Sequence, residues 1–189
     1  PLLAWFESLP AHETGPFDVA GVLHDDAVRE EYGVLLTLDV SAVGVPGGTL
    51  RPARGGVRLV VGGTAPAAEV ARWVAGRAIR TSAALRRPAF YANPGVPDDR
   101  RAQALRGVAL VGSVKSAALV GVTSRGGRLR ELAAAIRAWT RRVIAAHVGA
   151  IDARSAGVAT AILIGDRTGL SAEDERRLKD AGTSHVIAI

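Results

Sequence analysis

The hydrophobic period of the chain changes near residues 124–127, and this change limits the fold more than any other feature. Before it, short runs alternate apolar and polar residues, most clearly GVLLTLDVSAV at 33–43. Such alternation is typical of strands with one buried face. After it, apolar residues recur every three or four positions in residues 128–147, which predicts an amphipathic helix. The sequence therefore predicts strands first and helices second.

The strand-forming part predicts a small barrel. Four further strands are predicted at 17–23, 57–61, 77–85 and, as one bent closing strand around Gly112, 108–122. Short helices are predicted at 66–75 and 100–106, with a Pro-rich loop at 86–99. Five short strands with a helical insertion predict a mainly β fold, an OB-like Greek-key β-barrel over residues 17–124.

Three segments surround or follow this barrel. Residues 1–16 contain Pro10, Gly15 and Pro16 and few periodic apolar positions, so they are interpreted as a linker. Residues 153–164 are uncharged after Arg154 and rich in Ala, which predicts a buried helix. A capping box opens a last short helix that Gly182 ends. The expected domains are residues 1–16, 17–124 and 128–189.

The net charge of +6 is unevenly distributed. Residues 1–71 hold four Arg and nine acidic residues, residues 72–154 hold sixteen basic and four acidic residues, and residues 155–189 hold four basic and five acidic residues. Only Lys115 and Lys179 are Lys. Two explanations of the many Arg stay open: a GC-rich genome, and the suitability of Arg for contacts with phosphates and bases. The middle segment is the strongly basic one.

Several classes of protein and site are not indicated. Without Cys the chain has no disulfide framework and no thiolate metal site. No stretch approaches the roughly 18 uninterrupted apolar residues of a membrane-spanning helix. The chain lacks Met and ends in an apolar run, so we expect it to be an excerpt of a longer protein.

No motif of an active site is present. The four His residues show no metal-ligand spacing, and adjacent acidic pairs such as Asp25-Asp26 are interpreted as solvated loop residues. There is no phosphate-binding loop motif and no nucleophile motif. We therefore expect no metal, no cofactor and no catalysis in these 189 residues.

Basic residues of the middle segment are interleaved with aromatic residues, as in OB-folds that hold single-stranded nucleic acid on cationic grooves and stacking rings. The candidate DNA-binding residues are Arg77, Arg80, Arg86, Arg87, Tyr91, Arg100, Arg101, Arg106 and Lys115. Trp73 and Phe90 fit either a stacking surface or the core. A solvated face also accounts for such a charge run.

On the predicted helix at 128–147, Arg130, Arg137 and Arg141 cluster opposite the apolar stripe. For these three arginines, contact with anionic lipid headgroups, by a helix lying on a membrane, is the alternative to DNA binding.

Two parts of the chain resemble the ComEC-type DNA-uptake proteins. The run AILIGDRTGLS at 161–171, followed by AGTSHVIAI at 181–189, is similar to the start of that family's membrane competence domain. The run NPG at 93–95, with GVALVGSV at 107–114, is similar to the family's OB-like domain, although VPDD at 96–99 replaces the usual Phe-Asp. The positions that match the motifs are Asn93, Pro94, Gly95, Gly165, Asp166, Arg167, Gly169, Leu170, Gly182 and His185.

This resemblance implies a polytopic bacterial inner-membrane protein through which one DNA strand enters the cell during transformation. It implies that residues 1–16 are a juxtamembrane linker, that the barrel is extracytoplasmic, and that residues 128–189 begin the membrane domain before flanking transmembrane helices. The matched residues would shape the entrance to that domain, with Gly165 and Gly169 in a tight turn and His185 facing a polar passage or capping a helix. Many members also carry a C-terminal metallo-β-lactamase-like nuclease domain, which would lie outside these residues.

The expected function is to bind or guide transforming DNA, single-stranded and without sequence preference, to the channel. Expected partners are DNA, the membrane through flanking helices, and a second copy or other competence proteins. One alternative is a purely structural or oligomerisation domain without DNA contact. Another is a stand-alone OB-fold that binds single-stranded nucleic acid.

Overall fold

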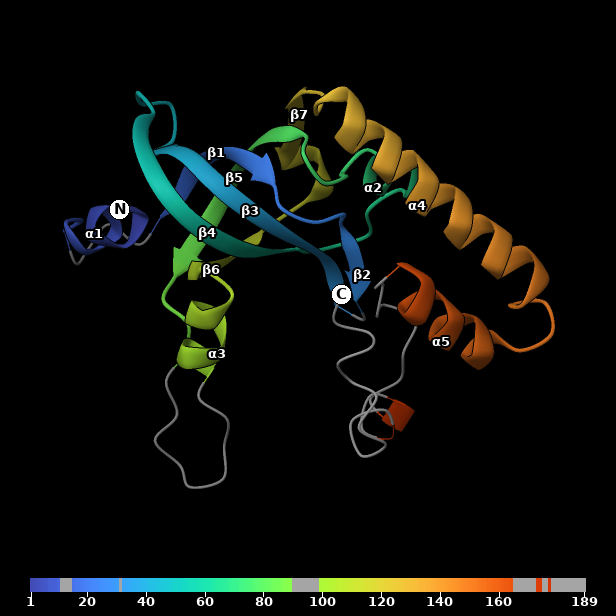
Figure 1. Ribbon diagram of the computed structural model, residues 1–189. Helices are drawn as coiled ribbons and strands as arrows, with labels where there is room; N and C mark the ends of the chain where they lie inside the picture. Colours follow the sequence, from blue (N-terminus) through green and yellow to red (C-terminus); the bar gives the residue numbers. More distant parts are fainter. Residues whose placement is uncertain (11–14, 31, 90–98, 165–172, 175–176, 178–189) are drawn as a thin grey trace. The chain divides into compact units, whose positions relative to one another are not determined.

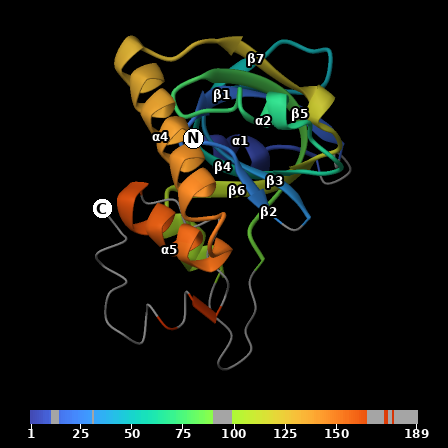
Figure 2. The same ribbon diagram turned by 90° about the vertical axis from the view of Figure 1, so that its right-hand side faces the viewer.

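The computed structural model of the chain describes residues 1–10, 15–30, 32–89, 99–164, 173–174 and 177. The chain divides into two compact units, Pro1–Glu131 and Leu132–Ile189. The division falls within the first turns of one long helix, α4 (Arg128–His147), shown in Figures 1 and 2.

The first unit is built on one sheet, which has seven strands in the described part of the chain. The strands are β1 (Pro16–Leu23), β2 (Val28–Glu30), β3 (Gly33–Gly44), β4 (Arg51–Val61), β5 (Ala78–Arg86), β6 (Val108–Val114) and β7 (Val120–Ser124). β1 pairs antiparallel with both β3 and β5, β3 pairs antiparallel with β4, and β4 runs parallel to β6. Because β6 also pairs with β5, hydrogen-bonded neighbours lead from β1 through β3, β4, β6 and β5 back to β1.

Helices are as abundant as strands. They are α1 (Leu2–Glu7), α2 (Ala67–Val70), α3 (Asp99–Leu105), a 3-10 turn (Ala117–Leu119), α4 and α5 (Ala153–Ile164). The fold is therefore mixed α/β, with roughly 36% strand and 35% helix. The expectation of a mainly β chain is too narrow, because α4 and α5 together contribute more than thirty residues outside the sheet.

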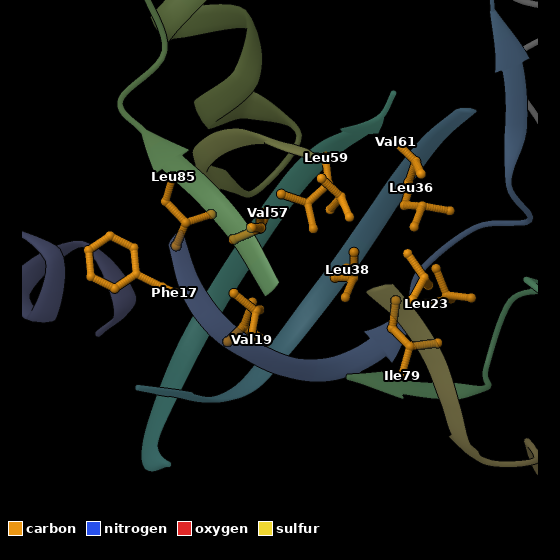
Figure 3. Packing of buried hydrophobic residues seen from close by; sticks show 14 of the residues in the cluster. Phe17, Val19, Leu23, Leu36, Leu38, Val57, Leu59, Val61, Ile79 and Leu85 are labelled. Atoms are coloured by element: carbon orange, nitrogen blue, oxygen red, sulfur yellow. The ribbon is translucent and has the colours of Figure 1, made fainter. Parts of the chain in front are cut away.

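The core of the first unit follows from the alternation in its strands. Along β3, Val34, Leu36, Leu38 and Val40 are buried, and the residues between them are more exposed. Figure 3 shows apolar side chains of β1, β3, β4 and β5 converging on one interior. Burying each such side chain contributes about 1.5–3 kcal/mol, so the alternation fixes which face of each strand turns inward.

Two predicted strands have different bounds in the structure. β4 begins at Arg51 rather than at residue 57, because Pro52 and the Gly55-Gly56 pair conceal its first half in the sequence. The single bent strand predicted at 108–122 is two strands, β6 and β7, separated by a 3-10 turn that Ser116 caps.

Gly112 allows two strands to approach closely rather than bending one long strand. A Cβ at this position would lie 2.4 Å from the carbonyl oxygen of Ala84 on β5. β6 can therefore pack between β4 and β5 only if this residue has no side chain.

The linker interpretation does not describe Leu2–Glu7, which form helix α1. Leu2 is fully buried, and the rings of Trp5 and Phe6 meet Phe17 of β1 edge to face with centroids 5.3 and 6.3 Å apart. A helix of six residues is too short to show a hydrophobic period, and for this reason the sequence does not reveal it.

The second unit contains most of α4 and all of α5, the two helices predicted after the strands. α4 and α5 have the expected bounds. α5 is not the buried helix that its composition predicts, because Ile162 and Leu163 are 51% and 67% exposed, although Ala161 is buried. The helix expected after the capping box falls largely outside the described residues. No helix in the described ranges is long and apolar enough to cross a membrane.

Candidate nucleic-acid interface

The predicted DNA-binding residues fall on three neighbouring places in the first unit. Arg77, Arg80, Arg86 and Arg87 lie on β5 or beside its ends, Arg100, Arg101 and Arg106 on α3 or just after it, and Lys115 follows β6. Tyr91 and the motif residues Asn93, Pro94, Gly95, Gly165, Asp166, Arg167, Gly169, Leu170, Gly182 and His185 lie outside the described residues.

Arg77 binds within the chain instead of facing solvent freely. Its Nε and Nη2 donate to the two carboxylate oxygens of Glu131 at 2.8 and 2.6 Å, and its Nη1 donates to the carbonyl of Arg72 at 2.9 Å. The hydrogen bonds from Arg77, followed by one from the backbone N–H of Gly126, lower the pKa of Glu131 to about 2. The ion pair of Arg77 with Glu131 therefore holds the first turn of α4 beside the start of β5.

Two more predicted residues also form ion pairs inside the first unit. Arg80 on β5 donates to Asp18 on the neighbouring β1 at 2.8 Å, and Arg87 donates to Glu7 of α1 at 2.8 Å. Both arginine side chains keep about half of their surface exposed. They can therefore still reach a phosphate, but an acidic neighbour offsets their charge.

The remaining predicted residues are exposed. Arg86, Arg106 and Lys115 form no ion pair with any residue that the structure describes. Arg100 and Arg101 are exposed on α3 and interact with other groups. The most available positive charges are therefore at the end of β5 and at the two ends of β6.

The sheet brings Arg86 next to an arginine that the sequence analysis missed. Arg86 on β5 and Arg58 on β4 are both register partners of Val111 on β6, one from each side. With strands about 4.8 Å apart, the two backbones lie about 10 Å from each other. Both residues alternate with buried residues, so their side chains share the outer face of the sheet.

A second pair of arginines meets at the start of the parallel strands. The amide of Gly56 on β4 donates to the carbonyl of Gly107, just before β6, at 3.1 Å. A Cβ on Gly56 would lie 2.5 Å from that carbonyl oxygen, so the close approach requires glycine. Arg54 and Arg106, both exposed, therefore lie two residues before Gly56 and one residue before Gly107, where the parallel pairing of β4 and β6 begins.

We call Arg54, Arg58, Arg86 and Arg106 the arginine cluster. One acid lies against it, since Arg58 and Glu30 are 3.5 Å apart. Charge density along the sequence does not single out Arg54 and Arg58, because they belong to the net acidic first segment. Their positions alternate with the buried Ala53, Val57 and Leu59, and this alternation was the available signal.

The structure shows which of the described aromatic residues lie in the core and which are exposed to solvent. Trp73 is a core residue with 2% of its surface exposed, and Phe90 lies outside the described part. Tyr32, in the turn between β2 and β3, is 81% exposed. Tyr32 is therefore the described aromatic ring most able to stack on a base, although it lies outside the basic segment that carried the prediction.

The two described histidines, His24 and His147, form contacts with nearby residues. No group of three or more His, Cys, Asp or Glu suitable for a metal occurs among the described residues. Nδ1 of His24 lies 3.0 Å from a carboxylate oxygen of Asp39, and this hydrogen bond raises the pKa of His24. His147 contacts the carbonyl of Val143 one turn earlier in α4 at 3.0 Å. These contacts are local.

Comparison of the chain with protein-family models and with curated proteins gives no match.

Proposed function

We propose that the first unit is an OB-like Greek-key barrel that binds single-stranded DNA without sequence preference. The strand pairings support this architecture. Five strands follow one another in a ring, two of them, β4 and β6, are parallel, and β1 is shared by β3 and β5. An OB-fold is a five-stranded Greek-key barrel that binds oligonucleotides on the face of its second and third strands and the neighbouring loops. β3 and β4 take those two positions here.

The arginine cluster is the observation that carries the proposal. Arg58 and Arg86 share the outer face of the sheet on either side of Val111, and the exposed Arg54 and Arg106 flank the contact between Gly56 and Gly107. Among the described residues, a single acid, Glu30, pairs with these four arginines. Arginine suits phosphate because its planar donors match two oxygens at once. A row of such groups can follow a nucleic-acid backbone, and exposed rings such as Tyr32 can stack on bases without reading them.

The resemblance to ComEC-type proteins suggests the larger protein to which this barrel belongs. We propose that residues 17–124 form the extracytoplasmic domain of a bacterial inner-membrane DNA-uptake protein and guide the transforming strand to its channel. Residues 128–189 would begin the membrane domain, and residues 1–16 would precede the barrel beside the membrane. Other competence proteins or further copies would be its partners, and this part would bind DNA without catalysing a reaction.

Titration of a fluorescent single-stranded oligonucleotide with the 189-residue chain, at several salt concentrations, tests the proposal. Replacing the arginine cluster by Gln should weaken binding and reduce the slope of log affinity against log salt by roughly 0.7 per lost phosphate contact. The matched control replaces Arg72, Arg125, Arg128 and Arg142, which removes the same charge elsewhere. Salt-independent binding, or an equal loss in both variants, would refute the arginine cluster as the DNA site.

A structural domain without DNA contact is the second candidate. The ion pairs of Arg77, Arg80 and Arg87 favour it, since they bind parts of the first unit together. DNA uptake by a transformable host that makes the arginine-cluster variant at normal levels distinguishes the DNA-binding function from the structural one. DNA uptake should fall if the barrel guides DNA, and it should stay normal if the barrel only supports the channel. A stand-alone nucleic-acid-binding module would bind DNA in solution, but the gene would encode no membrane-spanning helices around it.

A further inference from the structure

Helix α4 carries large apolar side chains on its outside. Leu129, Leu132, Ile136, Trp139 and Val143 are 83, 57, 54, 60 and 36% exposed. Their spacing of three and four residues places them on one face of the helix, which we call the apolar stripe of α4. An exposed stripe of this kind marks a surface that another apolar phase or partner covers.

The charges of α4 are almost all positive. The helix contains five Arg and one acid, Glu131, which is held by Arg77. Arg128 and Arg142 are exposed, and at about 100° per residue they lie roughly 60–100° from the midline of the apolar stripe, on the same side of it. Arg137 and Arg141, which the sequence analysis placed opposite the stripe, are half-buried and interact with other groups. The positive charge available beside the apolar stripe therefore comes from Arg128 and Arg142.

We propose that α4 lies flat on an anionic lipid bilayer, with its apolar stripe among the acyl chains and Arg128 and Arg142 at the headgroup phosphates. An interfacial helix needs an apolar face, a basic border and too little hydrophobicity to span the membrane. α4 has all three features. Trp139 lies at the edge of the apolar stripe that borders Arg128 and Arg142, and indole rings favour the membrane interface. The long Arg side chains can extend their charged ends to the phosphates while their stems stay apolar.

A second copy of the chain fits the apolar stripe less well. If two α4 helices packed along it, the flanking positions would face each other across the contact. These positions are Arg128, Ala135 and Arg142 on one side and Ala133, Thr140 and His147 on the other. None of them is acidic, so no flanking carboxylate would offset Arg128 and Arg142 in such a dimer. An anionic bilayer supplies the missing negative charge.

Flotation of the 189-residue chain with vesicles tests this proposal, without any DNA present. The chain should bind vesicles of phosphatidylcholine and phosphatidylglycerol and should bind pure phosphatidylcholine much more weakly. The Arg128→Gln/Arg142→Gln variant should lose about five-fold in partitioning per charge. The control variant Arg51→Gln/Arg72→Gln has the same net charge and should partition like the unaltered chain.

The apolar contribution is tested with Ile136→Ser/Trp139→Ser, which should partition at least about ten-fold more weakly. These side chains are exposed, so the variant should keep the circular dichroism spectrum of the unaltered chain. Brominated acyl chains should also quench part of the tryptophan fluorescence of the unaltered chain, and the variant should lose this quenching.

Three results would overturn the proposal: no binding to anionic vesicles at low salt, binding that the Ile136→Ser/Trp139→Ser variant retains, or a dimer in light scattering that this variant converts to a monomer. The last result would assign the apolar stripe to a second copy. The arginine-cluster variant should bind vesicles normally, so failure here is distinguishable from failure of the proposed DNA site.

Discussion

The sheet of the first unit and helix α4 are both amphipathic, but they treat their apolar faces in opposite ways. Leu36 and Leu38 of β3 and Leu59 of β4 are completely buried in the core of the first unit. On α4, Leu129 and Trp139 keep more than half of their surface exposed. The apolar face of the sheet is therefore buried within the chain, whereas the apolar stripe of α4 is exposed. The same comparison separates residues that maintain the fold from residues available for binding.

Truncating one aliphatic side chain in each region, Leu59 in the sheet and Ile136 on α4, tests this difference most directly. Leu59→Ala leaves a cavity in the sheet interior and should lower the free energy of unfolding by about 2–5 kcal/mol. Ile136→Ala removes an exposed side chain and should change it by less than about 0.5 kcal/mol. Urea denaturation followed by circular dichroism measures both. Similar losses in the two variants would mean that the apolar stripe of α4 is packed within the chain.

Glycine substitutions make the same comparison for the backbone. Gly112→Ala places a Cβ 2.4 Å from the carbonyl oxygen of Ala84, so β5 and β6 must separate. We expect a loss of about 1–3 kcal/mol in the free energy of unfolding. Gly127→Ala, just before α4, meets no atom within 4 Å and is the matched control. An equal effect of both substitutions in thermal denaturation would contradict the close packing of β6.

Glu131, in the first turn of α4, forms an ion pair with Arg77 beside β5, and the contribution of this pair to stability should depend on pH. The pKa of Glu131 is lowered from 4.5 to about 2 by Arg77, so the ion pair stabilises the folded chain above about pH 4.5. This stabilisation is lost as the pH falls toward 2. The melting temperature of Glu131→Gln should therefore be lower than that of the unaltered chain at neutral pH, and the difference should disappear near pH 2.

Glu69→Gln provides the control for that experiment, since Glu69 forms no ion pair with another described residue. It should leave the melting temperature almost unchanged across the same pH range. A pH-independent difference for Glu131→Gln would show that the side chain acts by packing rather than by charge.

The smallest predicted effect concerns the surface pair of His24 and Asp39. Their hydrogen bond raises the pKa of His24 above 6.5, so the pair stabilises the folded chain below that pH and loses its effect as the pH rises through the folded pKa. Asp39→Asn should lower the pKa of His24 in an NMR titration. Asp25→Asn, which removes a weaker influence, should lower it less.

The sequence predicts elements whose signal lies within one segment. The alternation of residues 33–43 and the helical period of residues 128–147 give β3 and α4 nearly to their ends. It does not reveal α1, which is too short for a period, or the first half of β4, where Pro52 and two Gly residues interrupt the strand pattern. Each of these is held by tertiary contacts instead of local preference.

The candidate site is harder to predict because it depends on strand pairing. Arg58 and Arg86 are neighbours only because both strands pair with β6 at Val111. Charge density along the sequence pointed to Arg77 and Arg80, but Glu131 and Asp18 bind them from distant positions. A basic segment in the sequence is therefore a poor guide to which arginines remain available.

The shared position of β1 also sets an order of assembly. β1 can pair with β3 as soon as residue 44 has been made, but its other edge pairs with β5, where Pro16 meets Ala84. Contacts between such distant residues form late, since a long loop must close first. Until then, β1 presents an open edge of unpaired amides and carbonyls, on which another chain can add a strand. In synthesis from the N-terminus, the interval before β5 emerges is therefore when this protein is most exposed to aggregation.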